Sequence, residues 1–271
     1  MITLSLYIPA MVELMSLRGT GTLDPERLPS RFRRQQPLAD HSEVVGWWWI
    51  SEWDLPEGTT APQRVLAFPT SNLVVETTMV VLSGPTTRAS TKVLSGSGWV
   101  LGALLRPAAV AALTSDPGRM RDRHEVFTAP ELHQLVADAS SLDEATRDFG
   151  LWLLNSVGHL KDEAVLANRL LDATMAEPGL SSVGALANHL GVSERTVHRL
   201  AQRYIGLTPY MMIRRRRLQE AAQQVRQEPQ CSLAEIAARH GFVDQAHLTR
   251  EFRQALGTTP RGYRQQVCAG K

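Results

Sequence analysis

A unit of about 50 residues occurs twice in the last third of the sequence, and this repeat restricts the fold more than any other feature. The first set of matches lies at an offset of 50, where Leu186, Ala187 and Gly191 recur as Ile236, Ala237 and Gly241. After one inserted residue the offset is 51, and Ser193, Val197, Arg199 and the run GLTP at 206–209 recur as Asp244, Leu248, Arg250 and the run GTTP at 257–260. The sequence therefore predicts two copies of one small fold.

Each copy has the parts of a helix-turn-helix. In the first copy, Ser181 or Ser182 is positioned to cap a short helix, Gly191 supplies a turn, and Ser193 is positioned to cap a second helix. In the second copy, Ser232 and Glu235 have the spacing of a capping box, Gly241 supplies the turn, and Asp244 caps the helix over 245–254. A helix pair of this kind occurs in many proteins, so the polar face of the second helix decides what the pair does.

Those polar faces are rich in cations, amides and histidine, with Glu194 as the single acid. Arginine matches the acceptor edge of guanine, glutamine matches adenine, and threonine contacts a base or the thymine methyl group. The alternative interpretation is an ordinary solvated face. The candidate DNA-binding residues are Ser193, Arg195, Thr196, His198, Arg199, Arg203 and Thr208 in the first copy, and Gln245, His247, Thr249, Arg250, Arg253 and Thr259 in the second.

A predicted helix over 209–227 joins the two copies, with Thr208 as N-cap and Pro209 at its first position. A helix of that length spans about 28 Å, close to the roughly 34 Å between successive major-groove faces of B-DNA. Thr208 and Thr259 are expected either to bind phosphate at a helix N-terminus or only to cap it. Arg214–Arg217 cannot share one face, so at least one is expected to serve the protein and the others water or phosphate.

The charge distribution supports a nucleic-acid partner. The net charge is +2, but from Leu180 onward there are 14 Lys and Arg against 6 Asp and Glu, and the preceding residues carry 15 against 21. An acidic first part and a basic last part indicate a nucleic-acid-binding module attached to something else. No segment reaches the 18 or so apolar residues of a membrane span, and residues 1–19 lack the basic start of a signal peptide. A cytoplasmic location without membrane contact is expected.

The first part predicts short strands and then helices. Aromatic and β-branched runs at 44–53, 64–69, 72–82 and 98–105 alternate with Gly, Pro and Ser clusters, which favours an antiparallel barrel or sandwich. Helical patterns follow at 107–114, 129–140, 142–160 and 164–175. The last two are expected either to pack on the barrel or to form a subunit interface. The predicted division is 1–135 as a β-rich sensing domain, 136–178 as a helical connector, and 179–271 as the helix-turn-helix domain.

The segments 186–225 and 232–264 resemble the DNA-binding domain of the AraC/XylS family of transcriptional regulators. The resemblance implies two helix-turn-helix units joined by a linker helix, and a structural role for Arg217. It also implies base-facing roles for Arg195, His198, Arg199, Gln245, His247, Thr249 and Arg250. Ala246 departs from the family, in which serine is commoner. The segments 47–56, 64–76, 84–88 and 94–107 resemble more weakly the cupin-like sensor domains of one branch, so the fold class expected is α+β with a cupin-like barrel before an all-α domain.

An effector site is expected in the first part, because Trp47, Trp49, Trp99 and Arg106 are suited to an apolar pocket with one charge. Alternation sends Trp47 and Trp49 to one face and Trp48 to the other. Each tryptophan also fits an ordinary core. No metal site and no cofactor are expected, because the histidines are isolated and the two cysteines provide no four-ligand set.

The function expected is therefore a ligand-responsive, sequence-specific DNA-binding regulator that is not an enzyme and has no catalytic residues. Its expected partners are double-stranded DNA, an unidentified small-molecule effector, a second copy in a homodimer, and RNA polymerase if it is an activator. Two alternatives stay open. One is a DNA-targeted enzyme of the alkyl-transfer type, which needs an activated thiolate. The other is a regulator controlled by a protein partner.

Overall fold

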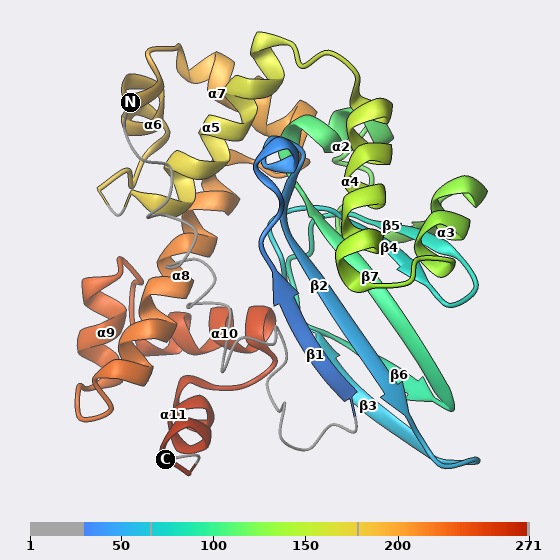
Figure 1. Ribbon diagram of the computed structural model, residues 1–271. Coiled ribbons are helices and arrows are strands. Elements are labelled where there is room, and N and C mark those ends of the chain that lie inside the picture. Colours follow the sequence, from blue (N-terminus) through green and yellow to red (C-terminus); the bar gives the residue numbers. More distant parts are fainter. Residues whose placement is uncertain (1–29, 66, 178, 270–271) are drawn as a thin grey trace.

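The computed structural model describes residues 30–65, 67–177 and 179–269 (Figure 1). Strands dominate up to residue 126 and helices dominate after it. The strands are β1 (Ser30–Gln35), β2 (Val45–Asp54), β3 (Thr60–Val65), β4 (Asn72–Glu76), β5 (Val80–Ser83), β6 (Ser90–Ser95), β7 (Ser97–Leu105) and β8 (His124–Val126). The helices are η3 (Ala39–His41), α2 (Pro107–Leu113), α3 (Pro130–Ala137), α4 (Leu142–Val157), α5 (Asp162–Ala176), α6 (Val183–Leu190), α7 (Glu194–Leu200), η4 (Ala201–Ile205), α8 (Pro209–Gln227), α9 (Leu233–Arg239), α10 (Gln245–Leu256) and α11 (Pro260–Ala269).

The strands form two antiparallel sheets. The larger has the order β1-β2-β7-β4-β5-β8, and the smaller consists of β3 and β6. The sheets meet at a tight corner, where Asp54 pairs with Ser97 in one sheet and Thr60 pairs with Ser95 in the other. The fold class is α+β as expected. The described strands, however, form no closed ring of hydrogen bonds, because β1 and β8 end the larger sheet without pairing with each other.

The strand prediction was incomplete because it relied on apolar runs. The run at 72–82 was expected as one strand and is a hairpin of β4 and β5, in which Val75 pairs with Val80. Strands β1, β6 and β8 were missed, since they are short and mostly polar. Such strands lie at edges or pair with other polar strands, so burial leaves no pattern in their sequences.

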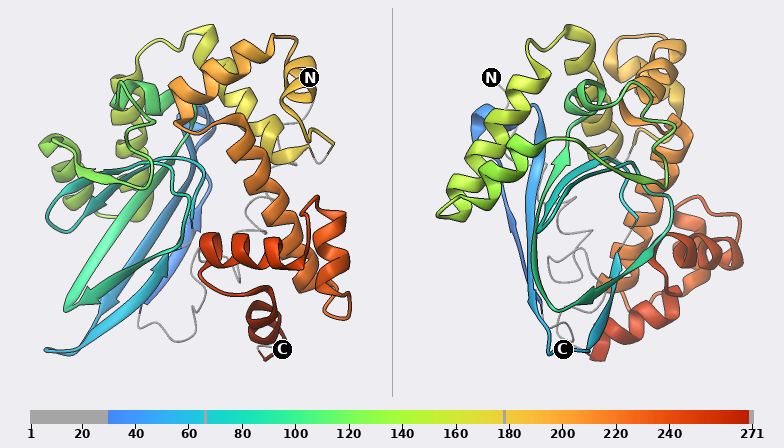
Figure 2. Two further views of the ribbon diagram at one scale, coloured as in Figure 1. Left: turned by 180° about the vertical axis from the view of Figure 1, so that it is seen from behind. Right: turned by 90° about the vertical axis from the view of Figure 1, so that its right-hand side faces the viewer.

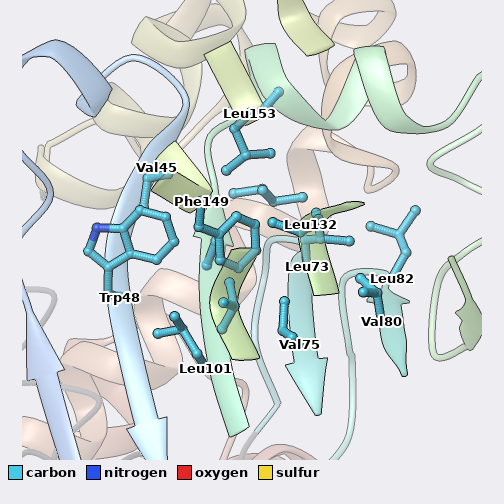
Figure 3. Packing of buried hydrophobic residues seen from close by; sticks show 14 of the residues in the cluster. Val45, Trp48, Leu73, Val75, Val80, Leu82, Leu101, Leu132, Phe149 and Leu153 are labelled. Carbon is cyan, nitrogen blue, oxygen red and sulfur yellow. The ribbon is translucent and has the colours of Figure 1, made fainter. Parts of the chain in front are cut away.

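One face of the larger sheet is covered by α3 and α4 (Figure 2, right) and holds the core of the first part. Figure 3 shows Trp48, Leu73, Val75 and Leu101 packed with Phe149, and Trp48 and Phe149 have their ring centroids 5.1 Å apart. Trp47 lies on the opposite face with Leu104 and Phe68. The predicted alternation of Trp47 and Trp48 is confirmed.

Helices α4 and α5 have different neighbours, although the sequence grouped them together. Helix α4 packs against α2 and α3, over the sheet. Helix α5 packs against α2 and also against α6, α7 and α8, and its Ala167, Leu170 and Leu171 share one buried cluster with Leu186 and Val197. Helix α5 is therefore part of the core beneath the first helix-turn-helix.

The two predicted helix-turn-helix units are present, and α8 connects them (Figure 1). The first unit consists of α6 and α7, which η4 extends, and Gly191 between them has φ +67°. The second consists of α9 and α10, where Ser232 and Glu235 form the predicted capping box and Gly241 has φ +71°. Each unit has its own apolar core, and α8 contributes Met212 and Ile213 to one and Leu218 and Val225 to the other.

Candidate nucleic-acid interface

The first unit presents α7 with a polar face outward. The Ser193 side chain caps the helix by accepting a hydrogen bond from the Thr196 N–H at 3.2 Å. Val197 and Leu200 are fully buried. Because these two face inward, Arg195, His198 and Arg199 on the other side are exposed, which is the arrangement a recognition helix needs.

The second unit presents α10 in the same way. Asp244 accepts a hydrogen bond from the His247 N–H at 2.6 Å, and Leu248 and Phe252 are fully buried. Gln245, Arg250 and Arg253 are consequently exposed. Thr249 is half-buried, and its hydroxyl donates to the Gln245 carbonyl at 2.8 Å, so that donor is already in use.

The cations of these faces fall into two groups. Arg195, Arg250 and Arg253 have no hydrogen bond or ion pair within the described residues. Arg199 and Arg203, in contrast, both contact Glu163 near the start of α5, the second across 3.1 Å. The hydroxyl of Tyr204 also donates to this carboxylate at 3.3 Å. Glu163 therefore binds two of the cations that the sequence assigned to DNA contact in the first unit.

In the second unit, Glu251 of α10 is likewise a carboxylate that binds an arginine from another helix. Its carboxylate accepts hydrogen bonds from Arg214 of α8, and these hydrogen bonds raise the pKa of Arg214. It also lies 3.9 Å from Nε2 of His247. The ring of His247 is packed edge-on against Phe242 with centroids 5.5 Å apart, and it is only half-buried.

The two threonines at helix starts act as caps. Thr208 accepts from the Met211 N–H at 3.2 Å, and Thr259 accepts from the Gly262 N–H at 3.0 Å. Thr208 is exposed and Thr259 is half-buried. The capping role of both is confirmed, and phosphate contact at these positions stays a prediction.

All four residues of the arginine run donate to protein groups, which corrects the expectation that most of them serve water or phosphate. Arg214 binds Glu251, and Arg215 donates to the Ala67 carbonyl. Arg216 is 3% exposed and donates to the Glu177 carbonyl, and Arg217 donates to the Ser181 carbonyl at 3.0 Å. The physical reason is that α8 is surrounded on several sides, by α5, α9, α10 and the sheet domain, so each direction has an acceptor.

The four residues expected around an effector do not lie together. Trp47 and Trp49 share one face of β2. Trp99 pairs with Glu52, whose side chain alternates to the face of β2 opposite that of Trp49. Trp99 therefore packs with the core on the other face of the sheet. Arg106 lies beyond the end of β7 and forms a two-point ion pair with Asp172 of α5.

Arg34 on β1 is a residue that the sequence interpretation missed. Its guanidinium lies over the rings of Trp47 and Phe32, at 5.2 and 5.8 Å from their centroids. Its Nε and Nη1 atoms are covered and have no hydrogen-bond partner. Burial lowers the pKa of Arg34 to about 10. In the sequence FRRQ, Phe32 and Arg34 have the spacing of residues on one face of a strand. Because no strand was predicted there, the sequence did not indicate which face of a sheet Arg34 lies on.

The described residues contain no group of three or more His, Cys, Asp and Glu able to hold a metal ion, and no described helix is long and apolar enough to span a membrane. Desolvation and the neighbouring Glu235 raise the pKa of the Cys231 thiol. A raised pKa disfavours the thiolate that alkyl-transfer chemistry requires. Residues 1–19, which lack the basic start of a signal peptide, lie outside the described residues.

Two known domain families match the chain. Residues 186–266 match the family described as "Helix-turn-helix domain", and residues 33–125 match a "Domain of unknown function (DUF6597)". The second match covers most of the sheet domain. It places this domain with others of the same family but assigns no ligand to it.

Among curated proteins, the HTH-type transcriptional activator RhaS of Pectobacterium carotovorum is 35% identical over 84 residues, which are 31% of this chain and 30% of that protein. RhaS of Escherichia coli K12 is 37% identical over 81 residues, 30% of this chain and 29% of that protein. The match therefore spans about a third of these relatives. Among solved structures, ToxT of Vibrio cholerae has a TM-score of 0.39 at 10% identity, with 88% of this chain and 97% of that chain covered. The AraC-like transcriptional activator CuxR has a TM-score of 0.24 at 12% identity, with 72% and 88% covered.

Proposed function

The C-terminal part of this chain is a helix-turn-helix domain of the AraC family, and on this premise we propose that the protein is a sequence-specific DNA-binding transcriptional regulator. The observation that carries the proposal is the pair of capped helices, α7 and α10, each held by its own apolar core with its cationic face outward. Arg195, Arg250 and Arg253 are exposed and unpaired within the described chain, so they are available to DNA without breaking a protein contact.

The proposed contacts follow the two faces. Arg195, His198 and Arg199 of the first unit and Gln245, His247 and Arg250 of the second read base edges. Arg203, Arg253 and the helix starts at Ser193, Thr208 and Thr259 bind phosphate. Thr196 and Thr249 support these contacts from the same faces. Double-stranded promoter DNA is the proposed partner, which places the protein in the cytoplasm.

We also propose that residues 1–135 sense a small-molecule effector and that residues 179–271 bind DNA. Residues 136–178 form the helical connector between these two domains. The face of β2 that carries Trp47 and Trp49 supports an effector site better than Trp99 or Arg106 do. Arg34 lies on this face with two N–H groups unpaired, so it is suited to an acidic group on a flat, apolar effector.

Activation and self-association are further parts of the proposal. The matched relatives are activators by name, which favours contact with RNA polymerase. Leu151 is 49% exposed and lies with Arg147 and Asn155 on the exposed face of α4. A homodimer through this helix predicts that Leu151→Lys halves the mass measured by sedimentation, and an unchanged mass would exclude α4 as the interface.

The test of DNA binding begins with selection of duplexes from a random-sequence pool by the full chain. Two reading helices on one polypeptide are expected to enrich a two-part motif with centres about 10 base pairs apart. Arg250→Ala should then weaken binding to the selected duplex by about 1–3 kcal/mol and relax the preference at one part of the motif. Arg239→Ala, which removes an exposed arginine of α9 paired with Glu228, is the matched control. No enriched motif, or equal losses for both variants, would refute the proposal.

A further inference from the structure

A basic loop of the sheet domain lies beside the first helix-turn-helix unit. This loop, residues 116–123, connects α2 to β8, and we call it the arginine loop. Its three arginines, Arg119, Arg121 and Arg123, are all exposed, and none of them has a carboxylate partner within the described residues. The sheet domain therefore presents three cations that are available to an anion outside the chain.

The arginine loop has a fixed shape. Met120 is 4% exposed and packs in the core of the sheet domain, so its neighbours Arg119 and Arg121 turn outward. Asp122 has φ +58°, and its carboxylate accepts hydrogen bonds from the Thr87 N–H and the Thr87 hydroxyl, both at 2.6 Å. The acid in the middle of the loop thus supports the loop itself, and the arginines are held on a built structure.

The start of the arginine loop touches the C-terminal end of the first reading helix. Gly206 ends η4 with φ +80°, and a Cβ at this position would lie 2.4 Å from the Pro117 carbonyl oxygen. A Cβ at Gly118 would lie 2.6 Å from Nε2 of Gln202, so the Gln202 amide packs directly on the backbone of the loop. Only glycine permits these two close approaches, which fix the loop against the end of the helix.

This contact places the loop at the end of the cationic face proposed for DNA reading. Arg195, His198 and Gln202 follow one another at spacings of three and four residues, so they lie along one face of α7 and η4. Seven helical residues span about 10 Å, and the major groove is about 12 Å wide. When the N-terminal residues of a reading helix contact base edges, the end at Gln202 reaches the phosphates that border the groove.

The arginine loop also lies beside the start of α8. Nη1 of Arg121 is 3.8 Å from Sδ of Met211, in the first turn of that helix. Thr208, the exposed N-cap, is three residues before Met211. The N-terminus of a helix carries a partial positive charge, which attracts the same kind of anion as a guanidinium does.

From this geometry we propose that the arginine loop binds the DNA phosphate backbone beside the half-site read by α7, through Arg119 and Arg121. The proposal rests on the proposed DNA-binding function and adds the sheet domain to the DNA-binding surface. Phosphate contacts contribute affinity without reading sequence. The loop therefore strengthens binding to every duplex and leaves the preferred motif unchanged.

The test compares the full chain with a variant that carries both Arg119→Gln and Arg121→Gln, on the selected duplex and on a random one. Loss of two phosphate contacts should reduce the log–log salt slope by about 1.8. At about 0.15 M salt this corresponds to binding that is roughly 5- to 30-fold weaker on both duplexes. Arg31→Gln combined with Arg33→Gln is the matched control, because it removes the same charge from β1, at the opposite edge of the larger sheet from β8, and it should change the slope little.

Hydroxyl-radical footprinting locates the contact. The unaltered chain should protect sugars beside the half of the motif whose preference Arg250→Ala leaves intact, and the loop variant should lose this protection alone. An unchanged salt slope or footprint, or an equal loss in the β1 control, would overturn the proposal. If the loop variant fails to fold, Arg119→Gln alone, which leaves the Met211 contact in place, should reduce the slope by about 0.9, and an unchanged slope would refute the contact.

The same measurements separate the two proposals. If Arg250→Ala weakens binding to the selected duplex while the loop variant binds as the unaltered chain does, the arginine loop has no role and the proposed function stands. If the unaltered chain binds no duplex, both proposals are refuted.

Discussion

Removal of the Glu163 charge should strengthen binding to DNA of any sequence. In the free protein, Glu163 of α5 holds Arg199 and Arg203 of the first reading helix. A guanidinium that moves to a phosphate or a base must leave this carboxylate first. In Glu163→Gln the shape of the side chain is kept and the competing charge is lost, so both arginines become available without that cost.

The expected magnitude follows from how exposed these groups are. Arg199 is 51% and Arg203 is 57% exposed, and Glu163 is 26% exposed, so solvent screens both pairs. Half-exposed ion pairs contribute about 0.2–1 kcal/mol each. Release of one or both therefore predicts a gain of about 0.2–2 kcal/mol, or roughly 1.4- to 30-fold in affinity. One additional phosphate contact should also steepen the log–log salt dependence by about 0.9.

The assay is fluorescence anisotropy with a labelled duplex of random sequence at several salt concentrations. Asp162→Asn is the matched control, because it removes the same charge one residue away, is exposed, and has no arginine partner among the described residues. The reasoning predicts a clear gain for Glu163→Gln and a much smaller one for Asp162→Asn. Equal gains would mean that only the overall charge matters. A loss of affinity in Glu163→Gln would mean that the carboxylate positions Arg199 for DNA rather than competing for it.

Three further perturbations test the fold that presents these residues. Asp244→Ala removes the N-cap of α10 and should lower the free energy of unfolding by about 0.5–2 kcal/mol in urea titrations, with weaker DNA binding; unchanged values would exclude the cap as a support of that helix. Gly102→Ala should destabilise the sheet domain by about 1–3 kcal/mol and change tryptophan fluorescence, because its Cβ would collide with the ring of Trp49, and normal stability would show that this ring moves freely. His41 is 2% exposed, and its burial lowers its pKa. The negative charge of Asp40 offsets only part of this shift. Because the unfolded chain binds the proton first, stability should be complete above about pH 6.5 and fall as the pH drops below it, and His41→Gln should reduce this slope in unfolding titrations at pH 7.5 and 5.5.

The helix-turn-helix half was predictable from the sequence because its signals are local. Caps, left-handed glycines and a proline at the first helical position act within a few residues of themselves. Thus Ser193, Asp244 and the capping box of Ser232 define helix starts, and the linker helix runs over 209–227 as predicted. The repeat also predicted that the unit occurs twice, since equal spacing implies equal structure.

The sheet half was predictable only where burial left a pattern. The run at 44–53 became β2 because both of its faces are packed, with Trp48 in one cluster and Trp47 in another. The polar strands β1 and β6 left no such pattern. Arg34 and its contact with Trp47 were therefore missed, because the two residues meet only when β1 pairs with β2.

The sequence by itself determined the repeat, the helix boundaries of the C-terminal part and the identity of its exposed cationic faces, since each depends on residues within a turn or two of one another. Only the tertiary structure decided which of those cations are free. Glu163 forms an ion pair with Arg199 from another helix. Arg214 binds Glu251, and Arg215 donates instead to the Ala67 carbonyl. Arg34 lies over the ring of Trp47 because β1 pairs with β2. Electrostatic partners are set by distance in space, and distance in space between remote segments is fixed by how the buried faces pack.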